Sequence, residues 1–206
     1  MSRTAVALAA LAAVPAAPAW AHEPDNPDAH RSMPNQVTAG VTALCPSAYA
    51  VHEPTGDASA EGVACIGAVI GVSREIGRTF ELRLRTSYER PFLFSGPDAV
   101  ANPLGSLHNV RATLGAGALF YRLSDMLTVT VGPELGLAAF LRETPNESRA
   151  YWGVAWGGVL GVRPWLTYHT GLFAEAAFGG AAAWEGDSTL RSTTLGRVSL
   201  GWADRF

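Results

Sequence analysis

The chain has 206 residues, of which 48% are hydrophobic and 16% are charged, and its formal net charge is −3. A chain of this length normally forms one domain, and its mildly acidic balance argues against nucleic acid as a partner. Beyond residue 21, no run approaches the ~20 apolar residues that a membrane helix needs, so any membrane crossing must use strands.

Residues 1–21 have the features of a secretory signal peptide. Arg3 precedes a short apolar run over 5–14, and the small residues Ala19 and Ala21 occupy the cleavage positions. A transmembrane anchor is the alternative, but the run is short and is followed by two prolines. We therefore expect export of the chain and cleavage after Ala21, and the signal peptide is excluded from the fold.

Residues 22–35 form a polar lead-in that contains several possible metal ligands, namely His22, Glu23, Asp25, Asp28 and His30. Metal capture is conceivable with this set, but its members lack the tight spacing of a metal site, and the segment contains three prolines. The sequence predicts a flexible lead-in, and it predicts neither a metal nor a cofactor.

The third part of the chain, residues 36–206, is the expected barrel domain. It contains eight segments in which apolar side chains alternate with small, polar or charged ones. In the third segment, for example, Phe80, Leu82 and Leu84 share one face and charged residues share the other. This period of two is typical of a β-strand, and most segments have the length of tilted membrane strands. The eight predicted strands are 36–44, 62–73, 79–90, 109–122, 127–141, 151–163, 166–178 and 193–206.

The connections between these segments alternate strictly between short and long. The short connections are 74–78, 123–126 and 164–165, and the long ones are 45–61, 91–108, 142–150 and 179–192. Tight turns at one end and longer loops at the other are typical of transmembrane barrels. The sequence therefore predicts an all-β fold, an eight-stranded antiparallel up-and-down transmembrane β-barrel with periplasmic turns and external loops.

The apolar face of such a barrel must point outward into lipid, because only a closed ring pairs every backbone polar group without water. Aromatic residues are expected in two outward girdles. The periplasmic girdle comprises Phe80, Phe120, Trp165, Tyr168 and Phe206, and the external girdle comprises Tyr88, Trp152 and Phe178. In a soluble ligand-binding barrel, the alternative, the two faces would exchange roles.

The last segment carries an apolar face that ends on an aromatic residue, formed by Val198, Leu200, Trp202 and Phe206. This face resembles the C-terminal assembly signal of bacterial outer-membrane barrels, although Asp204 stands where an aromatic residue is usual. The chain as a whole resembles the small barrels of the OmpA, OmpX and opacity-protein type. The resemblance implies a monomer in the outer membrane of a Gram-negative cell. The implied partners are membrane lipid, lipopolysaccharide and the barrel assembly machinery, together with an unidentified partner of the external loops.

The polar face supplies charged residues to the lumen of the barrel, which in an eight-stranded barrel is just wide enough for side chains to fill. We expect a network of charge-assisted hydrogen bonds in which Glu175 pairs with Arg197, and Glu134 meets Arg83 or Arg85. A structural role, in which this network fills and orders the lumen, is favoured over an ion-pair gate, because the charges nearly balance. The expected members are Glu81, Arg83, Arg85, Glu89, Arg111, Glu134, Arg163, His169, Glu175, Arg197 and Arg205.

Cys45 and Cys65 flank the first long connection, and in an exported protein they predict a disulfide across the base of that loop. A catalytic thiol is the less favoured alternative, because neither cysteine has an evident base beside it.

Three functions remain open. A structural or surface-interaction barrel that acts through its external loops is favoured, and a narrow channel for ions or small solutes is the alternative. A lipid-modifying enzyme is less favoured, because loop residues of these types are ordinarily solvated, and no catalytic residue is predicted. The residues available for catalysis are Asp57, Ser59, His108, Asp187 and Ser188.

Overall fold

The structure is a computed structural model of the chain that describes residues 33–77, 79–94, 104–122 and 126–206. The signal-peptide prediction for residues 1–21 and the metal-capture residues 22–30 lie outside the described residues. None of the described residues belongs to a helix long and apolar enough to span a membrane.

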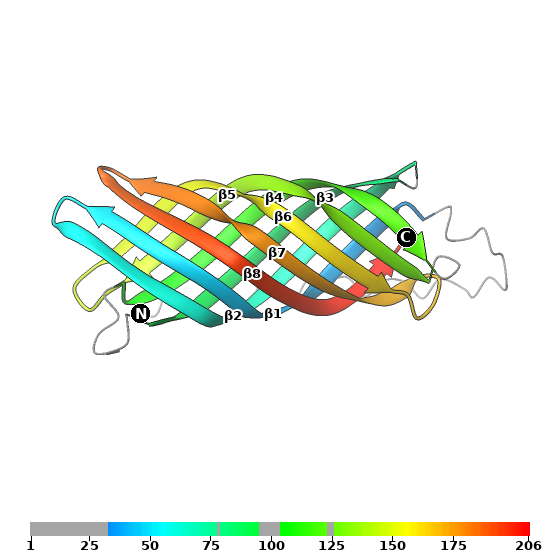
Figure 1. The fold of residues 1–206 in the computed structure, drawn as a ribbon, viewed down its shortest axis with the longest axis horizontal. Coiled ribbons are helices and arrows are strands. Elements are labelled where there is room, and N and C mark those ends of the chain that lie inside the picture. The colour runs from blue at the N-terminus through cyan, green and yellow to red at the C-terminus, as the bar shows by residue number, and fades with distance from the viewer. Residues whose placement is uncertain (1–32, 78, 95–103, 123–125) are drawn as a thin grey trace, which may run out of the picture.

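Eight antiparallel strands close into a barrel in which each strand pairs with its neighbours in the sequence, as predicted (Figure 1). The ring is completed where the first strand pairs with the last, and there Asn35 and Phe206 exchange backbone hydrogen bonds of 3.2 and 2.9 Å. The strands are β1 (Asn35–Glu53), β2 (Gly56–Ile76), β3 (Phe80–Phe94), β4 (Ser106–Arg122), β5 (Leu127–Glu143), β6 (Ser148–Pro164), β7 (Thr170–Glu185) and β8 (Ser188–Arg205).

We call the end of the barrel at which β1 begins and β8 finishes the terminal end. The opposite end, which carries the turns at 54–55, 144–147 and 186–187, is the hairpin end. Both names are kept below.

The strands are longer than predicted, at 15 to 21 residues, whereas ~9–11 residues span a bilayer. Segments 45–61 and 179–192, predicted as loops, are continuous hairpins with two-residue connections at 54–55 and 186–187, so that part of the loop prediction is wrong. Gly186 adopts a φ of 56° in the second of these turns, a backbone conformation that glycine adopts readily. Much of the extra length lies at the hairpin end, where the β1–β2 and β7–β8 ladders run on to these turns.

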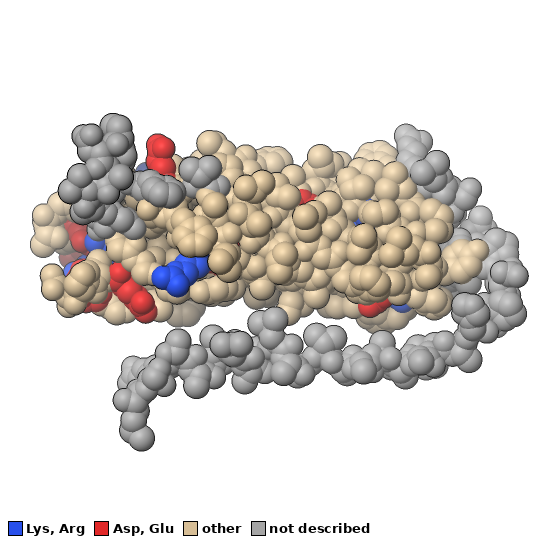
Figure 2. Space-filling model, turned by 90° about the horizontal axis from the view of Figure 1, so that it is seen from below, with Lys and Arg blue, Asp and Glu red and all other residues tan. Residues whose placement is uncertain are grey.

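The outer face of the barrel is apolar, as predicted. Near the middle of their strands, Leu114, Leu135 and Leu137 expose 63%, 65% and 68% of their surface. Figure 2 shows the same property as a wide band with few charged atoms, with most of the visible charge gathered at the hairpin end. An apolar exterior around a charged interior is the inverse of a soluble barrel, and it fits hydrocarbon as the surrounding solvent.

The interior has a polar half toward the terminal end and an apolar half toward the hairpin end. We call the apolar half the plug; its largest buried members are Tyr49, Val51, Leu104, Leu107, Phe140, Tyr151 and Leu190. The prediction of a lumen that is polar throughout is wrong for this half. Register irregularities in β1 between Thr42 and Ser47 explain part of the difference, because they turn the apolar Tyr49 and Val51 inward.

Candidate functional site

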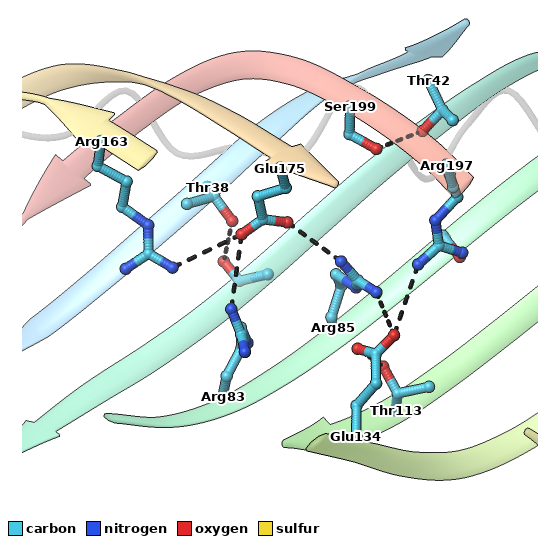
Figure 3. A network of polar contacts seen from close by, with 12 residues as sticks. Thr38, Thr42, Arg83, Arg85, Thr113, Glu134, Arg163, Glu175, Arg197 and Ser199 are labelled. Atoms are coloured by element: carbon cyan, nitrogen blue, oxygen red, sulfur yellow. Dashed lines mark hydrogen bonds and ion pairs between the residues drawn. The ribbon is translucent and has the colours of Figure 1, made fainter. Parts of the chain in front are cut away.

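Seven charged side chains form a continuous alternating series inside the polar half. Figure 3 shows its middle part, from Arg163 to Arg197. Five strands contribute to it, so the series crosses the lumen as well as following its axis. The order of contacts is Glu81, Arg163, Glu175, Arg85, Glu134, Arg197 and Glu89, and every neighbouring pair lies within 4 Å. We call this set the lumen series.

Arg85 is the central link of the lumen series. Its Nη1 donates to Glu175 over 3.1 Å and its Nη2 donates to Glu134 over 2.5 Å. Glu134 also accepts a hydrogen bond from the hydroxyl of Thr113 over 3.1 Å. Arg85 and Glu175 are almost fully buried. The predicted contact between Glu134 and Arg85 is therefore present.

The predicted pair of Glu175 with Arg197 is wrong. Arg197 instead donates to Glu89 over 2.6 Å, while Glu175 is met by Arg85, by Arg163 at 3.6 Å and by Arg83 at 3.7 Å. The reason is register. In the sheet Arg197 stands opposite Ala177 rather than Glu175, so it lies nearer the hairpin end and reaches across the lumen.

Both ends of the lumen series are anchored by further hydrogen bonds. At the terminal end, Arg163 donates two hydrogen bonds to Glu81, of 2.6 and 3.4 Å, and one to Gln36, of 2.8 Å. At the other end, the side-chain amide of Asn109 donates to Glu89 over 3.3 Å. Arg111, which lies outside the lumen series, donates to the hydroxyls of Ser192 and Thr194 over 3.4 Å each. The network therefore ties strands from all sides of the barrel together.

His169 was predicted to join this network, and that prediction is wrong. The residue is exposed in the bends at 166–169, which precede β7 rather than forming its start. Trp165 was predicted in the outer girdle, but it continues the inward phase of Arg163 and is buried. Its Nε1 donates to Thr128 over 2.9 Å, and Arg205 lies 3.7 Å above its ring.

The other predicted girdle residues in the described part of the chain face outward. Phe178 does not mark the external end of its strand, because β7 continues to Glu185; Trp184, which pairs with Trp152, stands closer to that end. The four predicted assembly residues, Val198, Leu200, Trp202 and Phe206, also lie on the outer face. Their role in assembly stays a prediction.

Beyond the plug, Glu53 joins three elements across the mouth of the barrel. It accepts hydrogen bonds from Arg142 over 2.5 Å and from the hydroxyl of Tyr151 over 2.9 Å, and Arg149 lies 3.6 Å away. Arg142 also donates to the backbone carbonyl of Leu104 over 3.2 Å. These contacts hold β1, β5 and β6 together directly above the apolar plug.

A small cavity is lined in part by Arg111, Thr113, Glu134 and Arg197. Its volume of about 10 Å³ is roughly enough for one water molecule. In the described part of the chain, no group of three or more His, Cys, Asp or Glu side chains is arranged to hold a metal ion.

The cysteines form a disulfide between neighbouring strands, with their Cα atoms 5.7 Å apart. Both side chains are buried inside the wall of the barrel. The bond does not lie at the base of a loop, because the β1–β2 hairpin continues for about eight residues beyond each cysteine. It covers the stretch of β1 in which the register is irregular, so it stabilises the weakest part of that ladder.

The candidate catalytic residues do not converge. Asp57 contacts His52, which was not among the candidates, at an exposed hairpin, and His108 contacts the hydroxyls of Tyr88 over 2.7 Å and Ser106 over 3.4 Å. Within the residues that the structure describes, the first contact has no hydroxyl nucleophile and the second has no carboxylate, so neither completes the arrangement of nucleophile, base and carboxylate.

Comparison with known proteins gives matches in fold. No protein-family model and no curated protein sequence matches the chain. Among solved structures, outer membrane protein OprG of Pseudomonas aeruginosa is similar, with a TM-score of 0.60 and 11% identity over 84% of this chain and 96% of that one. Neisserial surface protein A has a TM-score of 0.55 and 13% identity over 84% of this chain and 97% of its own.

A third similar structure is outer membrane protein AlkL in lipid bilayers, with a TM-score of 0.52 and 13% identity over 84% of this chain and 90% of that one. At such low identity these likenesses establish the architecture and nothing finer. Together with the apolar outer band and the closed ring of strands, they show that the chain has the fold of the small outer-membrane β-barrels.

Proposed function

We propose that this protein is a non-conducting scaffold of the outer membrane that presents its hairpin end to the surroundings of the cell. The observation that carries the proposal is the filled interior. A conduit would need a continuous water-filled path, but here the lumen series occupies the polar half and the plug occupies the rest. A barrel of eight strands has little room beyond such side chains.

The hairpin end is the part suited to contacts with partners. Its strands extend past the length that a bilayer needs, and the contacts of Glu53 hold the tops of β1, β5 and β6 in one arrangement. A rigid surface loses less conformational entropy on binding than a set of free loops. This supports surface interaction rather than transport as the function.

Single-channel recording in planar bilayers tests the proposal. The full-length protein, with membrane insertion verified by flotation of the same preparation in liposomes, is expected to leave the bilayer silent. Sustained discrete conductance steps would favour the alternative, a narrow channel. A variant with Arg85 and Glu134 both replaced by Ser keeps the plug intact, and it is also expected to be silent if the plug is a second, independent seal.

A further inference from the structure

The small cavity beside the lumen series has a lining with more positive than negative charge. Its charged members are Arg111, Arg197 and Glu134, which together give a formal charge of +1. Two hydroxyl-bearing residues, Thr113 and Thr194, also line it, and the rest of the lining is apolar. Figure 3 shows Arg197, Glu134 and Thr113 gathered on one side of the lumen.

Arg111 is the charged residue of this lining whose own contacts are weakest. Its side chain is almost fully buried, yet in the part of the chain that the structure describes it forms no ion pair. Its hydrogen bonds to Ser192 and Thr194 are long, at 3.4 Å each, and its Nε atom is buried without a hydrogen-bond partner among the described residues. Glu89 and Glu134 attract it from a greater distance, but both already accept hydrogen bonds from other side chains. A buried guanidinium in this position is costly unless something else offsets its charge.

The balance of charge in the polar half leads to the same residue. The lumen series holds four carboxylates and three guanidinium groups, and Arg83 and Arg111 lie beside it. Among the described residues between the plug and the terminal rim, where Arg205 lies over Trp165, five positive charges therefore meet four negative ones. Arg83 has an ion pair with Glu175 at 3.7 Å. The surplus of one positive charge thus falls to Arg111, at the cavity.

We propose that this cavity binds one small monovalent anion, with Arg111 as its main ligand and chloride as the representative ion. The volume of about 10 Å³ suits a single monatomic ion and excludes a carboxylate or phosphate group. A water molecule would satisfy the hydrogen-bond donors, but only an anion also offsets the surplus charge. The guanidinium groups of Arg111 and Arg197 and the hydroxyl of Thr194 supply donors for such an ion.

The direct test is to fold and crystallise the full-length protein with bromide as its only small anion. Bromide has the charge of chloride and scatters X-rays anomalously, so it is distinguished from water. Its presence during folding lets it enter before the ring of strands closes. We expect an anomalous peak inside the cavity, within hydrogen-bonding distance of the Arg111 guanidinium. A cavity without such a peak would overturn the inference, because water alone would then occupy it.

A second measurement detects the anion through stability. Urea unfolding in zwitterionic vesicles is followed as chloride replaces gluconate at constant ionic strength, because gluconate is too large for the cavity. For one site that binds only in the folded state, each tenfold rise in chloride beyond saturation should lower the unfolding equilibrium constant by about tenfold. General effects of the two salts are removed by comparison with variants.

Two variants that each lose one arginine supply this comparison. Arg111→Met removes the surplus charge and is expected to abolish the specific chloride response. The control, Arg191→Met, removes an exposed arginine of β8 and is expected to keep the response in full. Heat-modifiable migration on a gel checks that each variant is folded.

A chloride response of the same size in all three proteins would overturn the inference, because it would then arise from the salt in general. If Arg111→Met fails to fold, the bromide map of the unaltered protein decides. The ion is held as a part of the folded interior, so the inference goes beyond the proposed scaffold function. A failed bromide test leaves the silent-bilayer result untouched, and the anion site and the non-conducting scaffold stand or fall separately.

Discussion

The guanidinium of Arg197 on β8 donates a 2.6 Å hydrogen bond across the lumen to the carboxylate of Glu89 on β3. The two residues are 108 positions apart in the sequence, and both are almost fully buried. A buried ion pair contributes little more to stability than apolar side chains would contribute at the same two positions. Removing one partner, however, leaves the other as an isolated buried charge. It therefore fixes which strands face each other inside the ring.

Arg197→Met should lower the free energy of unfolding by about 3–5 kcal/mol, because Glu89 loses its closest counter-charge in a buried site. Urea unfolding in lipid vesicles measures this, and a double-mutant cycle identifies the partner. Arg197→Met and Glu89→Gln should be strongly non-additive, whereas Arg197→Met and Glu175→Gln should show a smaller coupling energy, because these two residues are connected only through Glu134 and Arg85. The reverse ranking would show that the pairing described here is wrong.

Leu135→Arg should destabilise the barrel by about 2–4 kcal/mol, because Leu135 lies at the centre of β5 on the lipid-facing surface. Glu143→Arg, at the end of the same strand, places the same side chain near water and should cost about 0–1 kcal/mol. Equal costs at the two positions, measured by unfolding in vesicles, would contradict a membrane around the middle of the strand.

Phe140→Ala should cost about 3–5 kcal/mol, since Phe140 is buried in the plug and its loss leaves a cavity among side chains. Leu137→Ala on the outer face of the same strand leaves no enclosed cavity and should cost less. If the plug were loosely packed or wet, the two variants would lose similar stability in the same unfolding assay.

Reduction of the disulfide between Cys45 and Cys65 should remove about 3 kcal/mol of stability, by the chain-entropy estimate for a closed loop of this size. The unfolded, unreduced protein should present no free thiol to a labelling reagent. A Cys45→Ser, Cys65→Ser variant is the control, because its stability should not respond to reductant. Two reactive thiols in the untreated protein would contradict the bond.

The strand count and the outward face were predictable from the sequence because they depend on local contrast. Where Phe80, Leu82 and Leu84 alternate with charged residues, period two is evident without any knowledge of neighbours. The same rule fails over 45–61 and 179–192, where alanine occupies both faces and the pattern loses its contrast. The hairpins there, and hence the plug that they help to enclose, carried no comparable signal.

The partners inside the lumen were not predictable for a different reason. The charged residues themselves were found by their phase, but which carboxylate meets which guanidinium depends on the stagger between strands that are not adjacent. Counting from strand ends placed Glu175 beside Arg197. In the actual register Arg197 stands two residues away, opposite Ala177, and it pairs with Glu89 instead. The inward direction of Trp165 could not be predicted either. It follows from the alternation that places Arg163 inside, but only once it is known that this alternation continues past residue 163.

Seven of the eight seams in this ring join segments that are consecutive in the chain, and only the seam between β1 and β8 joins its two ends. Forming that last ladder requires bringing together residues as far apart as Gln36 and Arg205, a search whose entropy loss grows with the length of the intervening chain. Until that ladder forms, the sheet has two edge strands whose outer backbone N–H and C=O groups are unpaired. Completion of the circle should thus be the late, rate-determining event in reaching the native state.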